Sequence, residues 1–498
     1  MRSAGVLLHP TALPGPGGCG GFGQAAHDWV ELLGCHEIGV WQLLPLAPTD
    51  GTGSPYSSPS GSALNPWLLD GERLVQEGFL QRADLEALPG ANACSGPVDL
   101  GAMPARSRAL GEALARCWPG QSAESHRAFG RWRRRQSGWL ADHALFMVIR
   151  RLQGGQPWWL WPAPLASRQW AALRRIRTER AAWLLEEELL QWQLERQWQQ
   201  LRCQAGQVGV QLLGDLPFYV AHDSADVWAH RSLFSLRPDG RLTAQSGVPP
   251  DYFSATGQLW GTPVYRWPLH LLSGFRWWLG RLQRQFDLFD RLRLDHFRAL
   301  QAYWSVPGDA PTAENGRWCW FPGWPLLSLL WLRQGMRLPL IAEDLGVITP
   351  AVEALRDGFQ LPGMKILQFA FDGDPTNPYL PANIRGNRWV VYTGTHDNAT
   401  SVGWWQSLDD GSRQRLAAAV GAPITAPAWQ LLELALASSA DLAVVPLQDL
   451  LELDDRARFN TPGTSSGNWI WRLDQPIASL DGALQGFGAM AARYGRGV

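Results

Sequence analysis

The chain has 498 residues, of which 46% are hydrophobic and 18% charged, and this composition excludes a disordered chain because it can build a large core. With 44 Lys and Arg against 45 Asp and Glu, its net charge of −1 lacks the basic excess of a general nucleic-acid-binding protein. No stretch reaches the about 18–20 apolar residues of a membrane span, and the N-terminal apolar run is too short for a secretion signal. The six scattered cysteines form no CxxC pair, which predicts reduced thiols in a cytoplasmic protein without structural zinc.

Eight short apolar runs of strand length end in polar or turn residues, and we predict that each is a strand. The runs are residues 5–9, 40–45, 210–215, 291–295, 338–344, 365–372, 389–397 and 442–449. Buried strands separated by helix-capable segments predict an α/β fold, the (β/α)8 TIM barrel, whose functional groups gather at the C-terminal ends of the strands. The alternative is a doubly wound open sheet, which is disfavoured because the sequence has neither a GxGxxG motif after a strand nor a P-loop.

Two long segments interrupt the regular spacing of these runs. Residues 70–205 carry apolar residues at helical spacing, which predicts an inserted helical subdomain between the second and third strands. Residues 220–290 form a second insertion, in which residues 247–263 are rich in glycine, proline and aromatic residues, as is typical of a lid or binding loop. We therefore expect one barrel over residues 1–498 with mainly helical insertions. The roughly 50 residues after the last run are too few for a C-terminal β-sandwich domain.

Acidic residues at the strand ends are the candidate catalytic groups. Arg293 and Asp295 lie two residues apart in one strand and point the same way, so the arginine would keep the carboxylate ionised, as a nucleophile requires. The alternative is a structural ion pair. Glu343 and Asp344 must face opposite sides of the next strand, and the pattern leaves open which of them is the proton donor. Asp344 is also a candidate cap for the helix expected to begin near Pro350.

His396 and Asp397 end the seventh predicted strand, where the histidine can donate hydrogen bonds and the aspartate can accept two hydroxyl groups. No second histidine stands at metal-ligand spacing, so we expect no metal ion. Carboxylates at the ends of three strands are a stronger signal than any one of them. Two opposed carboxylates with a third nearby match double-displacement chemistry at the anomeric carbon of a sugar.

Nine motifs extend this signal along the chain: GVLLHPTALP (5–14), SPY (54–56), GDLP (214–217), the segment 247–263, RLDHFR (293–298), AEDLG (342–346), LPGMKILQF (361–369), TGTHDN (393–398) and GNWIWR (467–472). In this order they resemble the 4-alpha-glucanotransferases of glycoside hydrolase family 77, the amylomaltases or disproportionating enzymes. The resemblance implies that Asp295 is the nucleophile, Glu343 the general acid/base and Asp397 the carboxylate that stabilises the transition state.

The resemblance also implies a set of residues that bind the substrate. These are Tyr56, Asp215, Gln258, Trp260, Arg293, His296, Asp372, His396 and Asn468. In the family, the segment that carries Gln258 and Trp260 bends over the glucan. The sequence departs from the family pattern at Thr262, Ala299 and Ala399, which leaves the three acids unchanged.

The activity implied by the resemblance is transfer of part of an α-1,4-glucan to the 4-hydroxyl group of another glucan or glucose. Maltooligosaccharides would be both donor and acceptor, the anomeric configuration would be retained, and no cofactor would be needed. One alternative is an α-1,4-glucan hydrolase of the α-amylase type, and another is a glucan-binding barrel without catalysis. Net hydrolysis of maltotriose would raise the number of reducing ends, whereas pure transfer would leave it constant.

Overall fold

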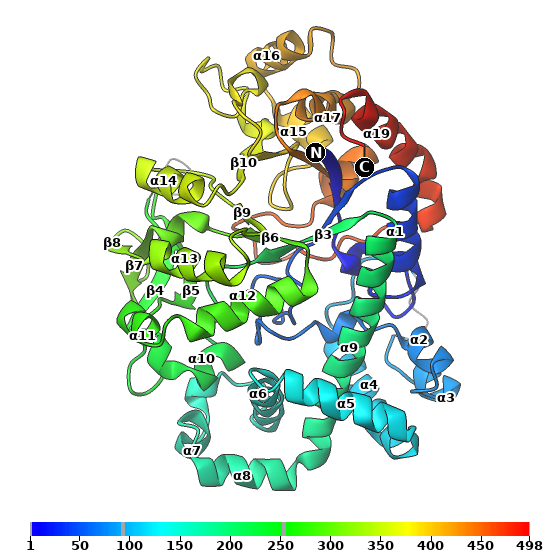
Figure 1. Cartoon of the computed structure of the whole chain (residues 1–498), viewed down its shortest axis with the longest axis vertical. Helices are drawn as coiled ribbons and strands as arrows, with labels where there is room; N and C mark the ends of the chain where they lie inside the picture. Colours follow the sequence, from blue (N-terminus) through cyan, green and yellow to red (C-terminus); the bar gives the residue numbers. More distant parts are fainter. Residues whose placement is uncertain (1, 91–94, 251–254, 498) are drawn as a thin grey trace.

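A barrel of eight parallel strands forms the centre of the computed structural model, which describes residues 2–90, 95–250 and 255–497 (Figure 1). The hydrogen-bonded order is β10-β11-β12-β1-β2-β3-β6-β9. These strands are β1 (Ser3–Leu7), β2 (Val40–Gln42), β3 (Gln211–Leu216), β6 (Arg291–Leu294), β9 (Leu340–Ala342), β10 (Gly363–Ile366), β11 (Trp389–Tyr392) and β12 (Leu442–Pro446). The two ends of the sheet meet where the Ala342 N–H donates to the Pro362 carbonyl oxygen at 2.8 Å. The predicted (β/α)8 barrel is confirmed, and the open doubly wound sheet is wrong.

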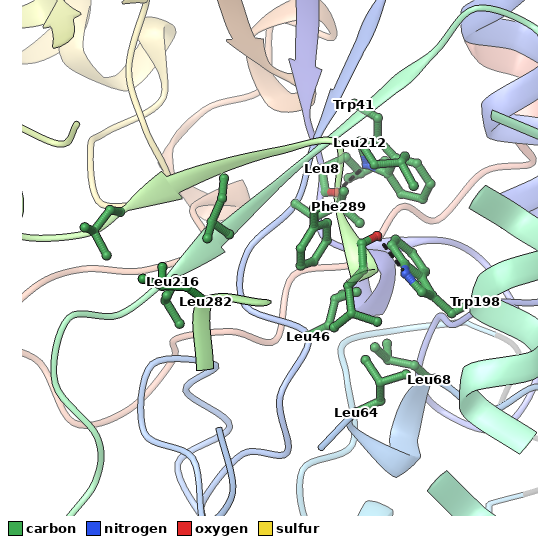
Figure 2. Packing of buried hydrophobic residues seen from close by; sticks show 14 of the residues in the cluster. Leu8, Trp41, Leu46, Leu64, Leu68, Trp198, Leu212, Leu216, Leu282 and Phe289 are labelled. Atoms are coloured by element: carbon green, nitrogen blue, oxygen red, sulfur yellow. Dashed lines mark hydrogen bonds between the residues drawn. The ribbon is translucent and has the colours of Figure 1, made fainter. Parts of the chain in front are cut away.

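The barrel strands are mainly apolar because both of their faces are buried. In β3, Leu213 belongs to the cluster that fills the barrel, whereas its neighbour Leu212 packs outward against the helices. Figure 2 shows this outer layer, in which Trp41 and Trp198 are fully buried. Their indole nitrogens donate to backbone carbonyl oxygens at 2.7 Å and 3.0 Å, so two large side chains enter the core with their polar atoms satisfied.

Helices make up most of the segment between β2 and β3. They are α2 (Gly71–Gln76), α3 (Arg82–Glu86), α4 (Met103–Cys117), α5 (Ala123–Arg135), α6 (Leu140–Leu152), α7 (Ala163–Ala166), α8 (Trp170–Glu179) and α9 (Ala181–Gln207). The Gln191 side chain of α9 bonds both the N–H and the carbonyl oxygen of Leu64, at 2.8 Å each. Gln197 bonds Asp70 in the same way, at 2.9 Å each. These two glutamines fix the chain that follows β2 against the helix that leads into β3.

The remaining helices lie between or after the other strands. They are α1 (Gln24–Cys35), α10 (Ala225–Ala229), α11 (Trp267–Leu272), α12 (Arg276–Leu288), α13 (Gly323–Arg333), α14 (Pro350–Gly358), α15 (Ser401–Ser407), α16 (Asp410–Val420), α17 (Pro427–Ala437), α18 (Leu447–Leu450) and α19 (Asp481–Arg493). In the part of the chain that the structure describes, no helix is both long and apolar enough to cross a membrane. The cysteines at positions 19, 35, 117, 203 and 319 are free thiols, and Cys94 lies outside the described residues.

A second, antiparallel sheet in the order β5-β4-β7-β8 lies beside the barrel, and the sequence analysis did not anticipate it. Its strands are β4 (Ala244–Val248), β5 (Gln258–Pro263), β7 (Ala302–Pro307) and β8 (Arg317–Trp320). The segment 247–263 was expected to be a turn-rich loop, but its described part contains the end of β4 and all of β5, and residues 251–254 lie outside the described residues. Gly261 and Pro263 are typical of a loop, and the strand forms because β4 pairs with it.

Seven of the eight predicted strands end earlier than their apolar runs, all except β3. The run 389–397 is a strand only to Tyr392, and the run 442–449 only to Pro446, after which α18 begins. Asp449 is consequently a buried helix residue that accepts hydrogen bonds from the Thr393 hydroxyl at 2.7 Å and the Ser401 N–H at 2.7 Å. This acid ties the end of β12 to the loop after β11, close to His396 and Asp397 in sequence.

Candidate active site

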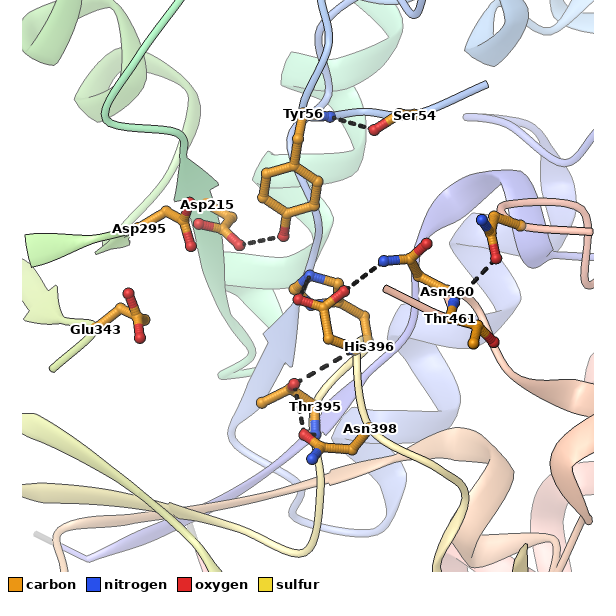
Figure 3. Close-up of polar contacts among 12 residues, drawn as sticks. Ser54, Tyr56, Asp215, Asp295, Glu343, Thr395, His396, Asn398, Asn460 and Thr461 are labelled. Carbon is orange, nitrogen blue, oxygen red and sulfur yellow. Dashed lines mark hydrogen bonds and ion pairs between the residues drawn. The ribbon is translucent and has the colours of Figure 1, made fainter. Parts of the chain in front are cut away.

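Two of the predicted catalytic acids, Asp295 and Glu343, lie beside the predicted substrate-binding Asp215 at the C-terminal end of the barrel. Asp215 is in β3, Asp295 follows β6 directly, and Glu343 follows β9 directly. Figure 3 shows these three carboxyl groups on one side of the site, with Tyr56 and His396 beside them. Parallel strands that end at one rim bring together side chains that are far apart in the sequence.

Arg293 connects two of the acids from the barrel wall. Its guanidinium nitrogens lie 2.6 Å from Asp215 Oδ2 and 2.8 Å from Asp295 Oδ1, and its side chain is almost completely buried. Burial alone would lower the pKa of Arg293, but the charges of Asp215 and Asp295 outweigh it and hold that pKa well above its usual range. The arginine therefore stays charged and orients the carboxylate of Asp295.

Asp215 is buried and only partly satisfied. Its Oδ2 accepts a hydrogen bond from the Tyr56 hydroxyl at 2.7 Å in addition to the contact with Arg293. Burial raises the pKa of Asp215, and the neighbouring guanidinium opposes that rise. Its Oδ1 has no hydrogen-bond partner among the described residues, and the same holds for Nε2 of His296. Buried polar atoms of this kind are open positions for the hydroxyl groups of a ligand.

Glu343 is held by backbone groups. The His296 N–H donates to its Oε2 at 2.7 Å and the Leu345 N–H to its Oε1 at 3.1 Å. His296 adopts a left-handed conformation with φ 52°, which turns the chain sharply just after Asp295 and presents this N–H to the carboxyl group. Burial first, and then the charge of Asp295, raise the pKa of Glu343 to about 7, against the opposing effect of Arg293. Near neutral pH, Glu343 can thus both give and take a proton.

Asp344 serves the fold instead. Its carboxylate accepts from Arg356 at 2.5 Å and from the Met364 N–H at the start of β10 at 2.7 Å. The suggestion that Asp344 caps the following helix is wrong, because Thr349 is the N-cap of α14 and the carboxylate is engaged elsewhere. The alternation of a strand accounts for this difference, since Glu343 faces the site and Asp344 faces the neighbouring strand.

Asp397 lies in the loop after β11 and is held by two neighbours. His396 Nε2 is 3.3 Å from its Oδ2, and Asn460 Nδ2 donates to its Oδ1 at 2.7 Å. Burial raises the pKa of Asp397, but His396, with the hydrogen bond from Asn460, outweighs it and holds the pKa well below its usual range. The carboxylate keeps 47% of its side-chain surface exposed, so it stays ionised and can accept hydroxyl groups.

Aromatic rings connect Asp397 to the other acids. The Tyr56 ring stacks on His396 with centroids 5.0 Å apart and planes at 16°, and Trp469 contacts both rings at 5.9 Å and 6.0 Å. Because the hydroxyl of Tyr56 bonds Asp215, one continuous set of contacts leads from Asp397 to Asp295.

The β5 strand contributes the other predicted aromatic residue. The Trp260 ring meets His296 edge-on at 4.9 Å, and its Nε1 donates to Gln258 Oε1 at 3.3 Å. Both side chains therefore stand next to the turn that follows the candidate nucleophile.

Asp372 and Asn468, which were predicted to bind the substrate, form hydrogen bonds within their own loops. The exposed Asp372 accepts from the Asp374 N–H and from Asn377 Nδ2, both at 3.0 Å. Asn468 accepts from the Thr461 N–H at 2.9 Å and donates to the Thr464 carbonyl oxygen at 3.1 Å, which closes the loop that begins after Asn460. Among the described residues, no group of three or more His, Cys, Asp or Glu side chains is placed to hold a metal ion.

Sequence reasoning missed Asn460, the hydrogen-bond donor to Asp397. It lies outside every predicted strand, in the stretch Asn-Thr-Pro-Gly, which indicates a turn and gives no sign of chemistry. The nearby GNWIWR motif was the available signal, since its Trp469 also contacts the site.

Comparisons with known proteins agree on one family. Residues 8–478 match the family model described as 4-alpha-glucanotransferase. A 4-alpha-glucanotransferase of Synechocystis sp. is 44% identical over 505 residues, which cover 100% of this chain and 98% of the relative. That of Thermus thermophilus is 45% identical, with 95% of each chain covered. The structure of amylomaltase from Streptococcus agalactiae in complex with acarbose matches with a TM-score of 0.94 at 32% identity and covers 100% of both chains.

Proposed function

The chain belongs to the 4-alpha-glucanotransferases of glycoside hydrolase family 77, and from this premise we propose how its residues exchange α-1,4-glucosidic bonds. Asp295 attacks the anomeric carbon C1 of the donor glucan while Glu343 gives its proton to the departing glycosidic oxygen. A covalent ester between Asp295 and the donor segment results, and the shortened glucan leaves with a free 4-hydroxyl group. Glu343, now ionised, then takes the proton of an incoming 4-hydroxyl group, whose oxygen attacks C1 and releases Asp295.

This proposal rests on the different surroundings of Asp295 and Glu343. Asp295 forms an ion pair with Arg293 at 2.8 Å, which orients its carboxylate. Glu343 is bonded by two backbone N–H groups, and its pKa of about 7 provides a proton donor near neutral pH. Different surroundings of two neighbouring carboxyl groups are the usual basis for dividing the acid and nucleophile roles between them.

The remaining site residues would bind the reacting glucose. Asp397 would accept hydrogen bonds from two hydroxyl groups of the sugar. It would bind the sugar more strongly as positive charge develops there in the transition state. The open atoms Asp215 Oδ1 and His296 Nε2 would bind further hydroxyl groups, with Tyr56 and His396 forming an aromatic wall. The other residues assigned to substrate binding are Gln258, Trp260, Asp372 and Asn468. The S. agalactiae relative is in complex with acarbose, and we propose that this chain binds glucans at the same place.

Three features of the wider molecule belong to the same proposal. Residues 1–498 would form one catalytic barrel, with 70–205 as a helical insertion and 220–290 as a second insertion. Within the latter, residues 247–263 would cover the site and keep water from the covalent intermediate. We also propose that the enzyme works in the cytoplasm on maltooligosaccharides.

Incubation with maltotriose alone tests the proposed transfer. Glucose and longer oligosaccharides should appear together while the number of reducing ends stays constant. A steady rise in reducing ends without longer products would instead identify an α-1,4-glucan hydrolase, and the absence of any reaction would point to a binding protein.

A further inference from the structure

Two tryptophans on the small sheet present their rings to solvent. β8 is an edge strand, and its Trp318 and Trp320 are 42% and 66% exposed. Residues two apart in a strand share a face, about 7 Å from each other. Trp304 of β7 pairs directly opposite Trp318 and meets its ring edge-on at 5.2 Å. On the opposite face of the same strands, Tyr303 is buried. The sheet therefore has one face turned to the protein and one aromatic face turned to solvent.

Arg298 joins this aromatic face to the loop that carries Glu343. Its guanidinium carbon lies 3.8 Å from the centre of the Trp318 ring, and its Nη1 donates to the carbonyl oxygen of Val347. Val347 stands four residues after Glu343 in the same loop. A general acid/base lies between the reacting sugar and the sugar that departs or arrives. The aromatic face is thus continuous with the acceptor side of the site.

We propose that Trp318 and Trp320 form a platform that binds the distal sugars of a long acceptor glucan, an inference that rests on the proposed function. Flat aromatic rings stack against the apolar faces of sugar rings, and exposed aromatic surface of this kind marks a binding site. The expected ligand of this aromatic face is an α-1,4-glucan, because a glucan whose end lies at Glu343 must continue over the neighbouring surface. A single glucose acceptor ends at the reacting bond and does not reach the platform.

The test compares acceptors of different length with one donor. α-Maltotriosyl fluoride serves as donor, and labelled glucose or a labelled long linear maltooligosaccharide serves as acceptor. The variants are Trp318→Ala, Trp320→Ala and Trp320→Tyr. Trp170→Ala is the matched control, because Trp170 is 69% exposed, carries Arg174 over its ring at 5.2 Å, and begins α8 far from β8 (Figure 1).

Each alanine variant should raise the KM for the long acceptor roughly three- to tenfold, the loss expected for one aromatic stacking contact. The ratio of kcat/KM for the long acceptor to that for glucose should fall by the same factor. Trp320→Tyr should recover most of this ratio, and Trp170→Ala should leave it as in the wild type.

The proposal is overturned if both acceptors are affected equally or neither is affected. It is also overturned if the wild-type enzyme is a dimer that Trp320→Ala converts to monomers without changing the ratio, since the face would then bind a second copy of the chain. Failure of the wild type to transfer to either acceptor would instead refute the proposed function itself.

Discussion

Arg293 forms ion pairs with both Asp215 and Asp295, whereas the two hydrogen bonds that Glu343 accepts among the described residues come from backbone N–H groups. A guanidinium stabilises the ionised carboxylates beside it, and a buried site near Asp295 stabilises the protonated form of Glu343. These surroundings follow from the positions of Arg293 in β6 and Asp295 directly after this strand, and from the tight turn at His296. At the residue scale, the proposed chemistry depends on the different surroundings of Asp295 and Glu343.

The pH dependence of the reaction follows from Glu343. Its pKa is raised to about 7, and the proposed first step needs its protonated form, so kcat/KM for maltotriose should fall about tenfold per pH unit above that value. A pH profile of kcat/KM measures this limb. With α-maltotriosyl fluoride, whose leaving group needs no proton, the same limb should be much weaker. An identical decline with both donors would show that another group titrates.

Asn460 is predicted to act as a positioning residue for Asp397. Asn460→Ala removes the 2.7 Å hydrogen bond to the carboxylate, and kcat should fall roughly ten- to a hundredfold with little change in KM. Asn387→Ala is the matched control, because Asn387 makes the same kind of bond to Asp441, at 3.0 Å, just before β11 at the other end of the barrel. Equal losses of kcat in the two variants would mean that Asn460 acts only on the fold.

At the scale of elements, the sequence predicts strands well where both faces of the strand are buried. It predicts them poorly where a segment is a strand only because it pairs with a neighbouring strand. The apolar runs that became β11 and β12 carry their own signal, because a parallel strand that is buried on both faces is mostly apolar. β5 contains Gly261 and Pro263 and is a strand because of its partner β4. Pairing of this kind leaves no periodic pattern in the sequence of the strand itself.

The segment between β4 and β5 is predicted to favour transfer over hydrolysis. If residues 249–257 are replaced by a two-residue turn, water should reach the ester on Asp295 more easily and the ratio of hydrolysis to transfer should rise severalfold. Reducing-end and product-ladder assays with maltotriose measure this ratio. The control shortens residues 421–426 between α16 and α17. If the ratio stays constant in the first variant, the segment does not exclude water.

At the scale of the whole molecule, contacts between residues near the two ends of the chain join β1 to β12. Arg496 is fully buried, and its guanidinium donates to the carbonyl oxygens of Leu436 at 2.7 Å, Ser438 at 3.0 Å and Ser3 at 3.2 Å. β1 and β12 are paired in the same region, so the first and last strands are held together from outside the barrel.

Arg496→Ala should therefore lower stability without changing the chemistry. The loss of three buried hydrogen bonds and of the packed side chain should reduce the free energy of unfolding by roughly 2–4 kcal/mol. Urea denaturation measures this loss, and the products formed from maltotriose should keep the wild-type ratio of transfer to hydrolysis. A change in that ratio would show that the chain ends influence the site.

The barrel and the acids of the site could be predicted from the sequence for a common reason. The apolar runs and the acids at their ends are local features of the sequence. In a (β/α)8 barrel the C-terminal ends of the strands lie at one rim, so these acids are expected to meet there. The small sheet and the role of Asn460 could not be predicted, because each depends on segments that meet only in the fold.

Direct detection of the covalent intermediate tests the central claim. The Glu343→Gln variant should react with α-maltotriosyl fluoride, whose leaving group needs no acid, and then stall because no base activates the acceptor. Mass spectrometry of the digested protein should find a glycosyl ester on the peptide that contains Asp295. An ester on another residue, or rapid turnover without any adduct, would contradict the account.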